Sequence, residues 1–188
     1  MMRIGITGSL ASGKTTASKI LSYKRGPLFS ADKVVKDLYH DKSFKRAISK
    51  KFKINNNNQI KKTLKKLILS NKKNIKKLEK IIHPLVRRKM KLFTQAHKNR
   101  KLLFYEIPLL IESKLMNKFD LVIFIKANKI LRSKRFKSKK GNKNLFKLLD
   151  SKQLKDSQKI KHCDIVVINK KNLTILKKKL NAIIQTYE

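Results

Sequence analysis

The chain has 188 residues, of which 40% are hydrophobic, and a formal net charge of +39 at pH 7. This length predicts one domain with inserted subdomains, and the apolar fraction is enough for a buried core. No stretch approaches the roughly 18 apolar residues of a membrane-spanning helix, so we expect no membrane association, and no secretory signal is expected at the N-terminus.

A phosphate-binding motif lies near the start of the chain. Residues 3–7, Arg-Ile-Gly-Ile-Thr, are predicted to form a short buried strand, and residues 16–21 the first turns of a helix. Between them, Gly8-Ser9-Leu10-Ala11-Ser12-Gly13-Lys14-Thr15 matches G-x-x-x-x-G-K-[ST] at every fixed position. Such a loop directs backbone N–H groups and a helix N-terminus at one point, where Lys14 reaches the β- and γ-phosphates and Thr15 holds Mg²⁺.

Asp32 follows a short second strand predicted over residues 27–30. Ligands of open parallel sheets bind outside the carboxyl ends of the strands, where the phosphate loop also lies. A carboxylate at this position could accept the proton of a substrate hydroxyl. It could equally be a helix N-cap, since Asp is favoured there. The residues alone leave both interpretations open.

The segment from residue 33 to residue 99 is predicted to be an all-helical insertion, because its apolar residues recur at helical spacing. Pro84 fits the first turn of a helix that runs to about His97. His83, just before it, could orient an imidazole towards a substrate or simply mark a helix boundary. The four asparagines at 55–58 are expected to form a solvated loop.

The C-terminal half alternates strands with helices. Strands are predicted over residues 102–105, 121–125 and 164–168, and helices over about 128–137 and 172–186. This alternation indicates βαβ units and a parallel sheet covered on both faces. The polar segment 138–144 between two helices suits a mobile lid. Arg132 and Arg135 precede it and could either clamp a phosphoryl group or belong to a solvated helix face.

Two glutamates flank an unusual turn, Ile-Pro-Leu-Leu-Ile, which follows the strand predicted over residues 102–105. Glu106 ends the strand at 102–105 and could position Mg²⁺ or its waters, or it could be a strand-end turn residue. Pro108 and the apolar residues after it make a rigid turn that could form a substrate wall. Glu112 lies at the end of this segment.

The extreme positive charge allows a nucleic-acid partner, but its composition favours another origin. Only eight of the 50 basic residues are Arg, and Lys is spread along nearly every polar helix face. Nucleic-acid readers concentrate Arg and interleave aromatic residues. We therefore attribute the charge to compositional drift in an AT-rich genome and do not expect nucleic acid as a partner. The single cysteine, Cys163, excludes an internal disulfide and fits a reducing, cytoplasmic setting.

Several segments in the same order resemble the dephospho-CoA kinase family, from Arg3 to about Asn169. They are the phosphate loop, Ser30-Ala31-Asp32, Leu78-Glu79-Lys80-Ile81-Ile82-His83-Pro84-Leu85-Val86, Ile107-Pro108-Leu109-Leu110-Ile111-Glu112, Arg135, Gln153 and Asp164-Ile165-Val166-Val167-Ile168-Asn169. The resemblance implies an α/β, nucleotide-kinase-type fold with a parallel core (about 1–32 and 100–188), a helical substrate-binding insertion (about 33–99) and a lid (about 136–150).

The resemblance also implies the reaction, in which MgATP phosphorylates the ribose 3′-hydroxyl of dephospho-CoA to give CoA and ADP. The alternative is a nucleoside monophosphate kinase or another small-molecule kinase of this fold. The resemblance implies catalytic roles for three residues, nucleotide contacts for seven and substrate contacts for four. They are Asp32, Lys14 and Arg135; Gly8, Ala11, Ser12, Gly13, Lys14, Thr15 and Thr16; and Asp32, His83, Pro108 and Glu112.

Three features depart from the family pattern. Ser9 and Ala11 stand where the family usually has Gly, which tightens the loop sterically. Ser30 replaces the first Asp of Asp-Ala-Asp. After Arg135 the family often has a second lid Arg, whereas here the nearby residues are Lys139 and Lys140, which lack the bidentate fork of a guanidinium.

Overall fold

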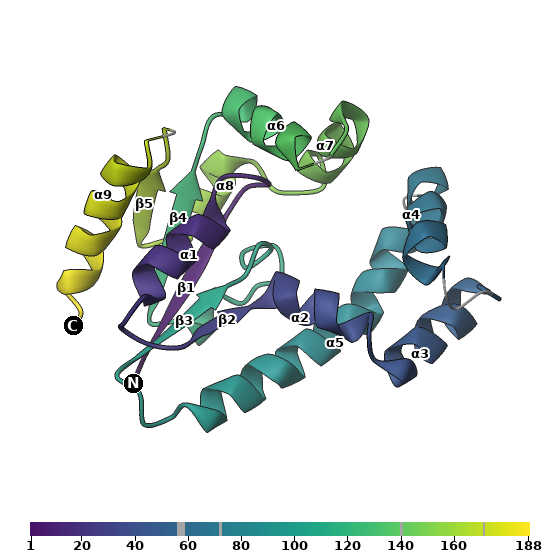
Figure 1. The fold of residues 1–188 in the computed structure, drawn as a ribbon, viewed down its shortest axis with the longest axis horizontal. Coiled ribbons are helices and arrows are strands. Elements are labelled where there is room, and N and C mark those ends of the chain that lie inside the picture. Colours follow the sequence, from purple (N-terminus) through teal and green to yellow (C-terminus); the bar gives the residue numbers. More distant parts are fainter. Residues whose placement is uncertain (56–58, 72, 140, 171) are drawn as a thin grey trace. The chain divides into compact units, whose positions relative to one another are not determined.

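The computed structural model describes residues 1–55, 59–71, 73–139, 141–170 and 172–188. Residues 56–58 of the expected loop at 55–58, and the lid residue Lys140, therefore lie outside the described residues. The elements follow in this order (Figure 1): β1 (Met2–Gly8), α1 (Lys14–Ser22), β2 (Leu28–Ser30), α2 (Ala31–Leu38), α3 (Lys42–Phe52), α4 (Ile60–Ser70), α5 (Lys73–Ala96), β3 (Leu102–Glu106), η2 (Met116–Lys118), β4 (Leu121–Lys126), α6 (Lys129–Ser138), α7 (Lys143–Asp150), α8 (Asp156–Ile160), β5 (Ile165–Ile168) and α9 (Leu173–Gln185).

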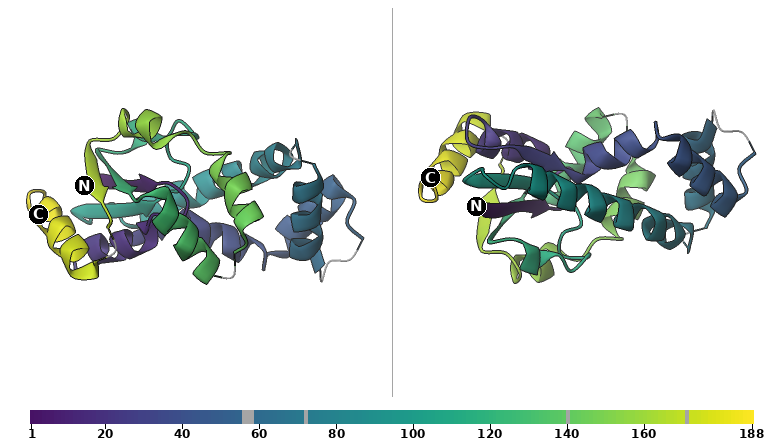
Figure 2. Two further views of the ribbon diagram at one scale, coloured as in Figure 1. Left: turned by 90° about the horizontal axis from the view of Figure 1, so that it is seen from above. Right: turned by 90° about the horizontal axis from the view of Figure 1, so that it is seen from below.

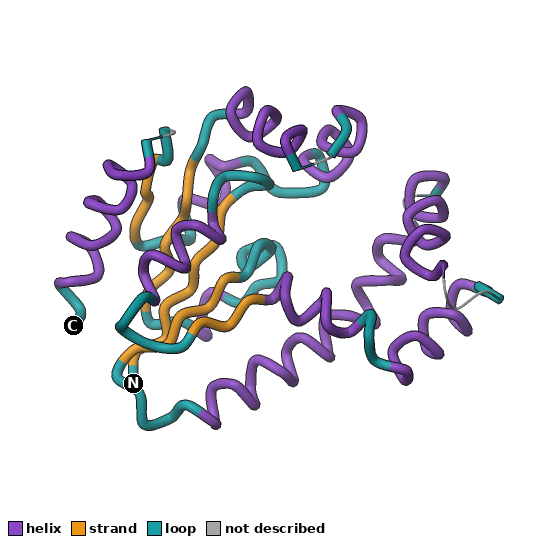
Figure 3. The backbone as a smooth tube through the Cα atoms, in the orientation of Figure 1, coloured by secondary structure: helices purple, strands orange, loops and turns teal. Residues whose placement is uncertain are grey.

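These elements form two compact units, one of Met1–Ser30 with His97–Glu188 and one of Ala31–Ala96. The first unit holds a parallel sheet in the order β2-β3-β1-β4-β5, drawn in orange in Figure 3. β1 is central, and Ile4 pairs with Phe104 of β3 on one side and with Leu121 of β4 on the other. This arrangement confirms the predicted parallel α/β sheet.

One face of the sheet packs against α1 and α9, as the two views of Figure 2 show. The core on this face contains alternate residues of the central strands, such as Ile4, Ile6 and Phe104, together with Leu21 of α1 and Leu180 of α9. The intervening residues point to the opposite face, because successive side chains of a strand alternate. There the ring of Tyr105 contacts those of Phe29 and Phe119, with centroids 5.9 and 5.3 Å apart.

The second unit is a helical subdomain of α2, α3, α4 and α5 with a core of its own. Its buried residues are Leu38, Phe44, Ile48, Ile54, Ile60 and Leu64. The side chain of Asp41 accepts a 2.8 Å hydrogen bond from the backbone N–H of Phe44 and so caps α3. The hydrogen bond from the Ser43 hydroxyl, followed by this one from Phe44, lowers the pKa of the Asp41 carboxyl.

The prediction that Pro84 begins a helix is wrong, because α5 runs without a break from Lys73 to Ala96 with Pro84 inside it. An internal proline removes one backbone hydrogen bond and costs about 3 kcal/mol. The apolar stripe explains why the helix continues. Leu78, Ile81, Ile82 and Leu85 lie on both sides of the proline and all pack on the core of the helical subdomain.

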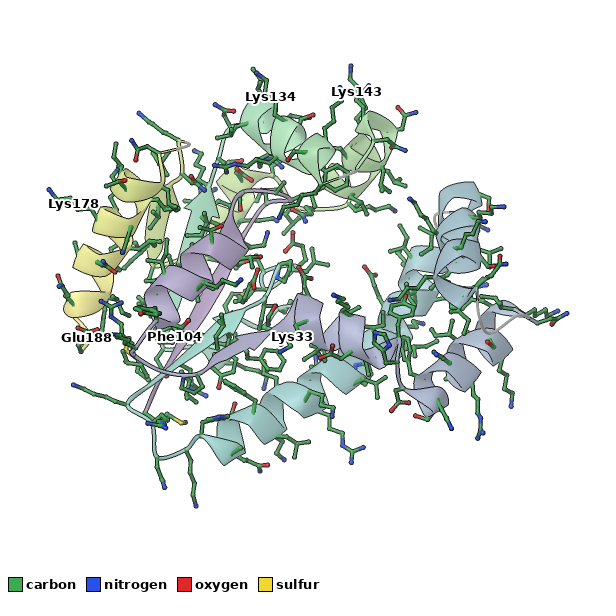
Figure 4. The ribbon with its side chains drawn as sticks, in the orientation of Figure 1. Lys33, Phe104, Lys134, Lys143, Lys178 and Glu188 are labelled. Carbon is green, nitrogen blue, oxygen red and sulfur yellow. The ribbon has the colours of Figure 1, made fainter. Side chains whose placement is uncertain are left out.

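Lysine side chains project from the outer helices into solvent, as Lys134, Lys143 and Lys178 do in Figure 4, whereas Phe104 lies in the core. This distribution fits a solvated surface. Among the described residues, none of the helices is long and apolar enough to cross a membrane.

Candidate active site

The phosphate loop connects β1 to α1 through an unusual backbone. Gly8 and Gly13 have φ angles of 149° and 101°, which L-residues with a side chain rarely adopt. A Cβ at Gly8 would lie 2.4 Å from the carbonyl oxygen of Ile125, so no side chain fits there. Ala11 also has a positive φ, of 58°, which explains why glycine suits this position better.

Lys14 is the first residue of α1 and is only 8% exposed. Its Nζ atom donates hydrogen bonds of 2.9 Å to the carbonyl oxygens of Gly8 and Ser9. The ammonium group is therefore held inside the curve of its own loop. Backbone N–H groups at a helix N-terminus have no partner within the helix, so those at the start of α1, together with this cation, are suited to bind an anion. Ser12 adds a buried hydroxyl that makes no hydrogen bond within the described part of the chain.

A carboxylate and two hydroxyl groups meet beside this loop. Glu106, the last residue of β3, is 2% exposed. Its Oε1 accepts a 2.5 Å hydrogen bond from the Thr15 hydroxyl, and its Oε2 accepts a 3.1 Å bond from the Ser30 hydroxyl. These groups are all hard oxygen donors, which Mg²⁺ prefers, and Mg²⁺ needs only one or two protein ligands beside water and phosphate. The residues present therefore fit a magnesium ion.

Arg135 on α6 contacts the loop from the side opposite β3. Its Nη1 donates to the carbonyl oxygen of Ser12 at 3.0 Å, and its Nη2 donates to the side chain of Asn169 at 3.1 Å. Asn169 follows β5, and its amide nitrogen donates to the same Ser12 carbonyl oxygen at 2.9 Å. Burial lowers the pKa of the Arg135 guanidinium from its ordinary value.

Arg132, one turn earlier on α6, connects this helix to α7. Its Nη1 donates to Asp150 of α7 at 2.5 Å and to the carbonyl oxygen of Leu10 at 3.3 Å. Its guanidinium also lies 5.8 Å from the ring centre of Phe146. Both arginines therefore contact the loop backbone. Arg132 also forms an ion pair with Asp150, whereas Arg135 forms none with the residues that the structure describes.

A cavity of about 390 Å³ lies at the carboxyl ends of β4 and β5. It is lined by Lys126, Ala127, Asn128, Ile168, Asn169 and Lys170. Since Asn169 also bonds to Ser12, this cavity and the phosphate loop share a side chain. The position agrees with the rule that ligands of parallel sheets bind beyond the carboxyl ends of the strands.

Pro108 and Glu112 lie in the turn after β3, on the same compact unit as the loop. The carbonyl oxygen of Pro108 accepts a 3.2 Å hydrogen bond from the hydroxyl of Thr7, the residue before the loop. The Glu112 carboxylate already has partners within the protein. Its Oε1 lies 2.7 Å from Nζ of Lys159 and accepts a hydrogen bond from the backbone N–H of Leu154. Its other oxygen is buried and has no hydrogen bond within the described residues.

Asp32 and His83 belong to the helical subdomain. Asp32 is exposed and is the second residue of α2, inside its first turn, so it is not the residue that precedes the helix. A carboxylate there interacts favourably with the helix dipole. His83 is half-buried within α5 and is not a helix-boundary residue.

Two residues that contact the loop or its supports, Lys159 and Asp156, were not singled out from the sequence. Lys159 is fully buried, but in a chain with so many lysines the sequence gives no indication that this one is unusual. Asp156, the first residue of α8, accepts a hydrogen bond from the Ser9 hydroxyl. The scarcity of acidic residues was the one available clue.

Comparison with known proteins gives a consistent result. A family model described as dephospho-CoA kinase matches residues 2–174. A dephospho-CoA kinase of Fusobacterium nucleatum is 34% identical, over 99% of this chain and 98% of its own length. Among solved structures, a protein of Thermus thermophilus has a TM-score of 0.82 and a dephospho-CoA kinase of Campylobacter jejuni has 0.65. Each is 24% identical and covers at least 99% of this chain and 97% of the matched one, which shows a shared fold.

Proposed function

Because the chain belongs to the dephospho-CoA kinase family, we propose that it transfers the γ-phosphoryl group of ATP to the ribose 3′-hydroxyl of dephospho-CoA. The products are CoA and ADP, and the reaction is the final step of CoA biosynthesis. The family match over residues 2–174, which includes a loop folded for phosphate, carries this proposal. The lone Cys163 supports a cytoplasmic setting.

In the proposed complex, the loop from Gly8 to Thr16 holds the phosphates of ATP through backbone N–H groups. Lys14, whose ammonium group the carbonyl oxygens of Gly8 and Ser9 hold inside the loop, pairs with the β- and γ-phosphates. Arg135 turns from Ser12 to the transferring phosphoryl group, where a guanidinium stabilises developing negative charge. The cavity beyond β4 and β5 accepts the adenine base.

Asp32 is the proposed general base. The 3′-hydroxyl oxygen of dephospho-CoA forms a bond to the γ-phosphorus while the bond from that phosphorus to the β–γ bridging oxygen breaks, and ADP leaves. The hydroxyl proton passes to the Asp32 carboxylate. Support comes from its place two residues after β2, whose last residue, Ser30, bonds to Glu106 beside the loop.

Mg²⁺ would be held by the Thr15 hydroxyl, with Glu106 as a direct ligand or as an acceptor for its bound water. When bound, the ion neutralises charge on the β- and γ-phosphate oxygens. Glu106 itself keeps Thr15 and Ser30 in fixed orientations.

His83 and Pro108 are proposed to contact dephospho-CoA. For Glu112 we propose a supporting role instead of the substrate contact expected from the sequence, because Lys159 and the Leu154 N–H already use its Oε1. The substrate wall is then the apolar turn that Pro108 begins.

The test is a side-by-side assay of ATP consumption with dephospho-CoA, AMP, dTMP and bulk RNA as the second component. We expect ADP and CoA to form in equal amounts with dephospho-CoA and little turnover with the others. Phosphorylation of a nucleoside monophosphate without CoA formation would establish the alternative kinase. Tight RNA binding that ATP does not displace would assign a separate role to the positive charge.

A further inference from the structure

The outer side of the phosphate loop contacts the segment from Gln153 to Lys159, which the reaction described above does not use. The backbone N–H of Leu10 donates a 3.1 Å hydrogen bond to Oε1 of Gln153. The Ser9 hydroxyl donates to the carboxylate of Asp156. Two consecutive loop residues are thus tied to one short segment about 145 positions later in the sequence, as the bonds span 147 and 143 positions.

The peptide group between Ser9 and Leu10 forms hydrogen bonds at both its N–H and its carbonyl oxygen. Its N–H bonds to Gln153, and its carbonyl oxygen, that of Ser9, accepts the 2.9 Å bond from Nζ of Lys14. No described peptide is cis, so this N–H and C=O point in opposite directions. The orientation that satisfies Gln153 is therefore the one that presents a carbonyl oxygen to Lys14.

Lys159 fixes the orientation of the Gln153 side chain. Its Nζ donates a 3.1 Å hydrogen bond to the same Oε1 atom that accepts from Leu10. Lysine is a donor only, as is a backbone N–H, so both neighbours require the oxygen and exclude the NH₂ end of the amide. Without Lys159, one of the two reasons for this amide orientation is lost.

The position of Lys159 is itself strongly determined. The residue is 0% exposed, and its Nζ lies 2.7 Å from Oε1 of Glu112. A buried ammonium group must be paired, because desolvation of an isolated charge is very costly. Glu112 is held in turn by the N–H of Leu154, next to Gln153.

We propose that Lys159 is a positioning residue, which acts through Gln153 on the Ser9–Leu10 peptide and so sets the place of Lys14 in the phosphate loop. Lys159 touches no substrate, and its role rests on the phosphate-loop chemistry of the proposed function. Loss of this support leaves the Leu10 N–H without its partner, so that only the bonds from the Ser12 N–H and Lys14 to the Ser9 carbonyl oxygen orient the peptide. We infer that the carbonyl partner of Lys14 and the N–H groups around the phosphates are then less firmly placed.

The first test changes Gln153, because the Lys159–Glu112 pair then stays intact and the core keeps its charge balance. Gln153→Met removes the acceptor, and we expect MgATP affinity and kcat each to fall by about tenfold, a typical cost for a supporting contact. KM for dephospho-CoA is expected to stay within about twofold of the wild-type value. Gln153→Glu keeps an oxygen for both donors, so it is expected to retain roughly wild-type affinity and rate.

The second test removes the buried charge pair as a unit, with Lys159→Met and Glu112→Gln in one chain, so that neither charge is left unpaired. We expect the same loss of MgATP affinity and kcat. The matched control is Arg3→Met with Asp120→Asn, which removes an ion pair of 2.8 Å on the same sheet without a contact to the loop. The control is expected to behave as the wild type does.

Unchanged MgATP affinity and kcat in folded Gln153→Met protein would overturn the proposal, as would an equal loss in Gln153→Glu. A rise confined to KM for dephospho-CoA would assign the cluster to the substrate wall instead. If the protein with both Lys159→Met and Glu112→Gln does not fold, the comparison of Gln153→Met with Gln153→Glu still tests the proposal. If the wild type makes no CoA, the proposed function fails, while the MgATP affinities still decide whether Lys159 and Gln153 position the loop.

Discussion

The Thr15 hydroxyl donates a 2.5 Å hydrogen bond to Oε1 of Glu106, a residue 91 positions later in the chain. The parallel register of the sheet produces this contact, because Ile6 of β1 pairs with Glu106 of β3 and the phosphate loop follows directly. The last fixed position of the loop motif thus faces the last residue of the neighbouring strand. This contact connects nucleotide binding to a carboxylate that the motif does not include.

Replacing Glu106 by Gln tests its proposed link to Mg²⁺. Gln keeps an oxygen that can accept from Thr15 but loses the charge, so we expect the Mg²⁺ concentration for half-maximal rate to rise about tenfold. The measurement is a Mg²⁺ titration at saturating ATP and dephospho-CoA. Ser30→Ala is the control, since it removes the other hydrogen bond of Glu106 but not the charge. A large loss of kcat that excess Mg²⁺ does not restore would instead make Glu106 the base.

Lys14→Ala is expected to lower kcat by about 100-fold or more, because an electrostatic contact to the transferring phosphoryl group is lost. Steady-state kinetics and a thermal melt on the same sample measure the effect. Lys19→Ala, at an exposed site on the same helix, is the matched control and is expected to leave both unchanged. Near-normal turnover of folded Lys14→Ala protein would contradict the assignment of the loop.

Asp32→Asn separates a base from a residue that only stabilises a helix start. Asn cannot take the hydroxyl proton, so we expect kcat to fall by roughly 10²–10⁴. The loss of its interaction with the dipole of α2 is expected to cost only about 0.3–1 kcal/mol of stability. Asp37→Asn, at an exposed site on the same helix, controls for the charge change. If kcat of Asp32→Asn stays within a few-fold of the wild type, the base lies elsewhere.

Ala11→Gly is expected to stabilise the protein slightly. Ala11 has a φ of 58°, where a side chain costs about 1 kcal/mol, and the greater freedom of Gly in the unfolded chain offsets part of this gain. We expect Tm to rise by about 1–3 °C with catalysis retained. Ala17→Gly, in the interior of α1, is expected to lower Tm, because Gly is unfavourable in a helix. If Ala11→Gly and Ala17→Gly shifted Tm in the same direction, this explanation would be contradicted.

We expect the stability of the protein to depend on pH through the thiol of Cys163. Burial, and then the charge of Asp164, raise the pKa of Cys163 to about 11. The folded chain therefore keeps this proton while the unfolded chain loses it near pH 9, so the contribution of the thiol is complete below pH 9 and declines as the pH rises towards 11. The measurement compares the slope of Tm against pH, from 8 to 11, for the wild type and Cys163→Ala. Identical slopes would contradict it.

The sequence predicted the strands and the loop well, because a buried parallel strand is a continuous apolar run and the loop motif is local. It failed at Pro84, where a local rule for helix starts competed with an apolar stripe whose packing on the helical subdomain carries the helix through the proline.

The supports of the loop were harder to predict for a different reason. Thr15 and Glu106, or Leu10 and Gln153, meet only through the strand order and register of the sheet. The sequence around Lys159 also does not distinguish it from the many other lysines. Only its complete burial beside Glu112 does so. Local patterns predict the groups that are proposed to bind phosphate, whereas tertiary contacts determine which side chains hold those groups in place.

The central place of β1 in the sheet also bears on how the chain is made. β1 leaves the ribosome well before its two partners, which are β3, beginning at Leu102, and β4, ending at Lys126. Until β3 has been synthesised, the strand that carries the phosphate loop has no neighbour on either edge, and until β4 has been synthesised one edge stays unpaired. These long-range pairings close slowly. Nucleotide binding therefore arises only after β4 has been synthesised, and until then β1 is exposed to mispairing.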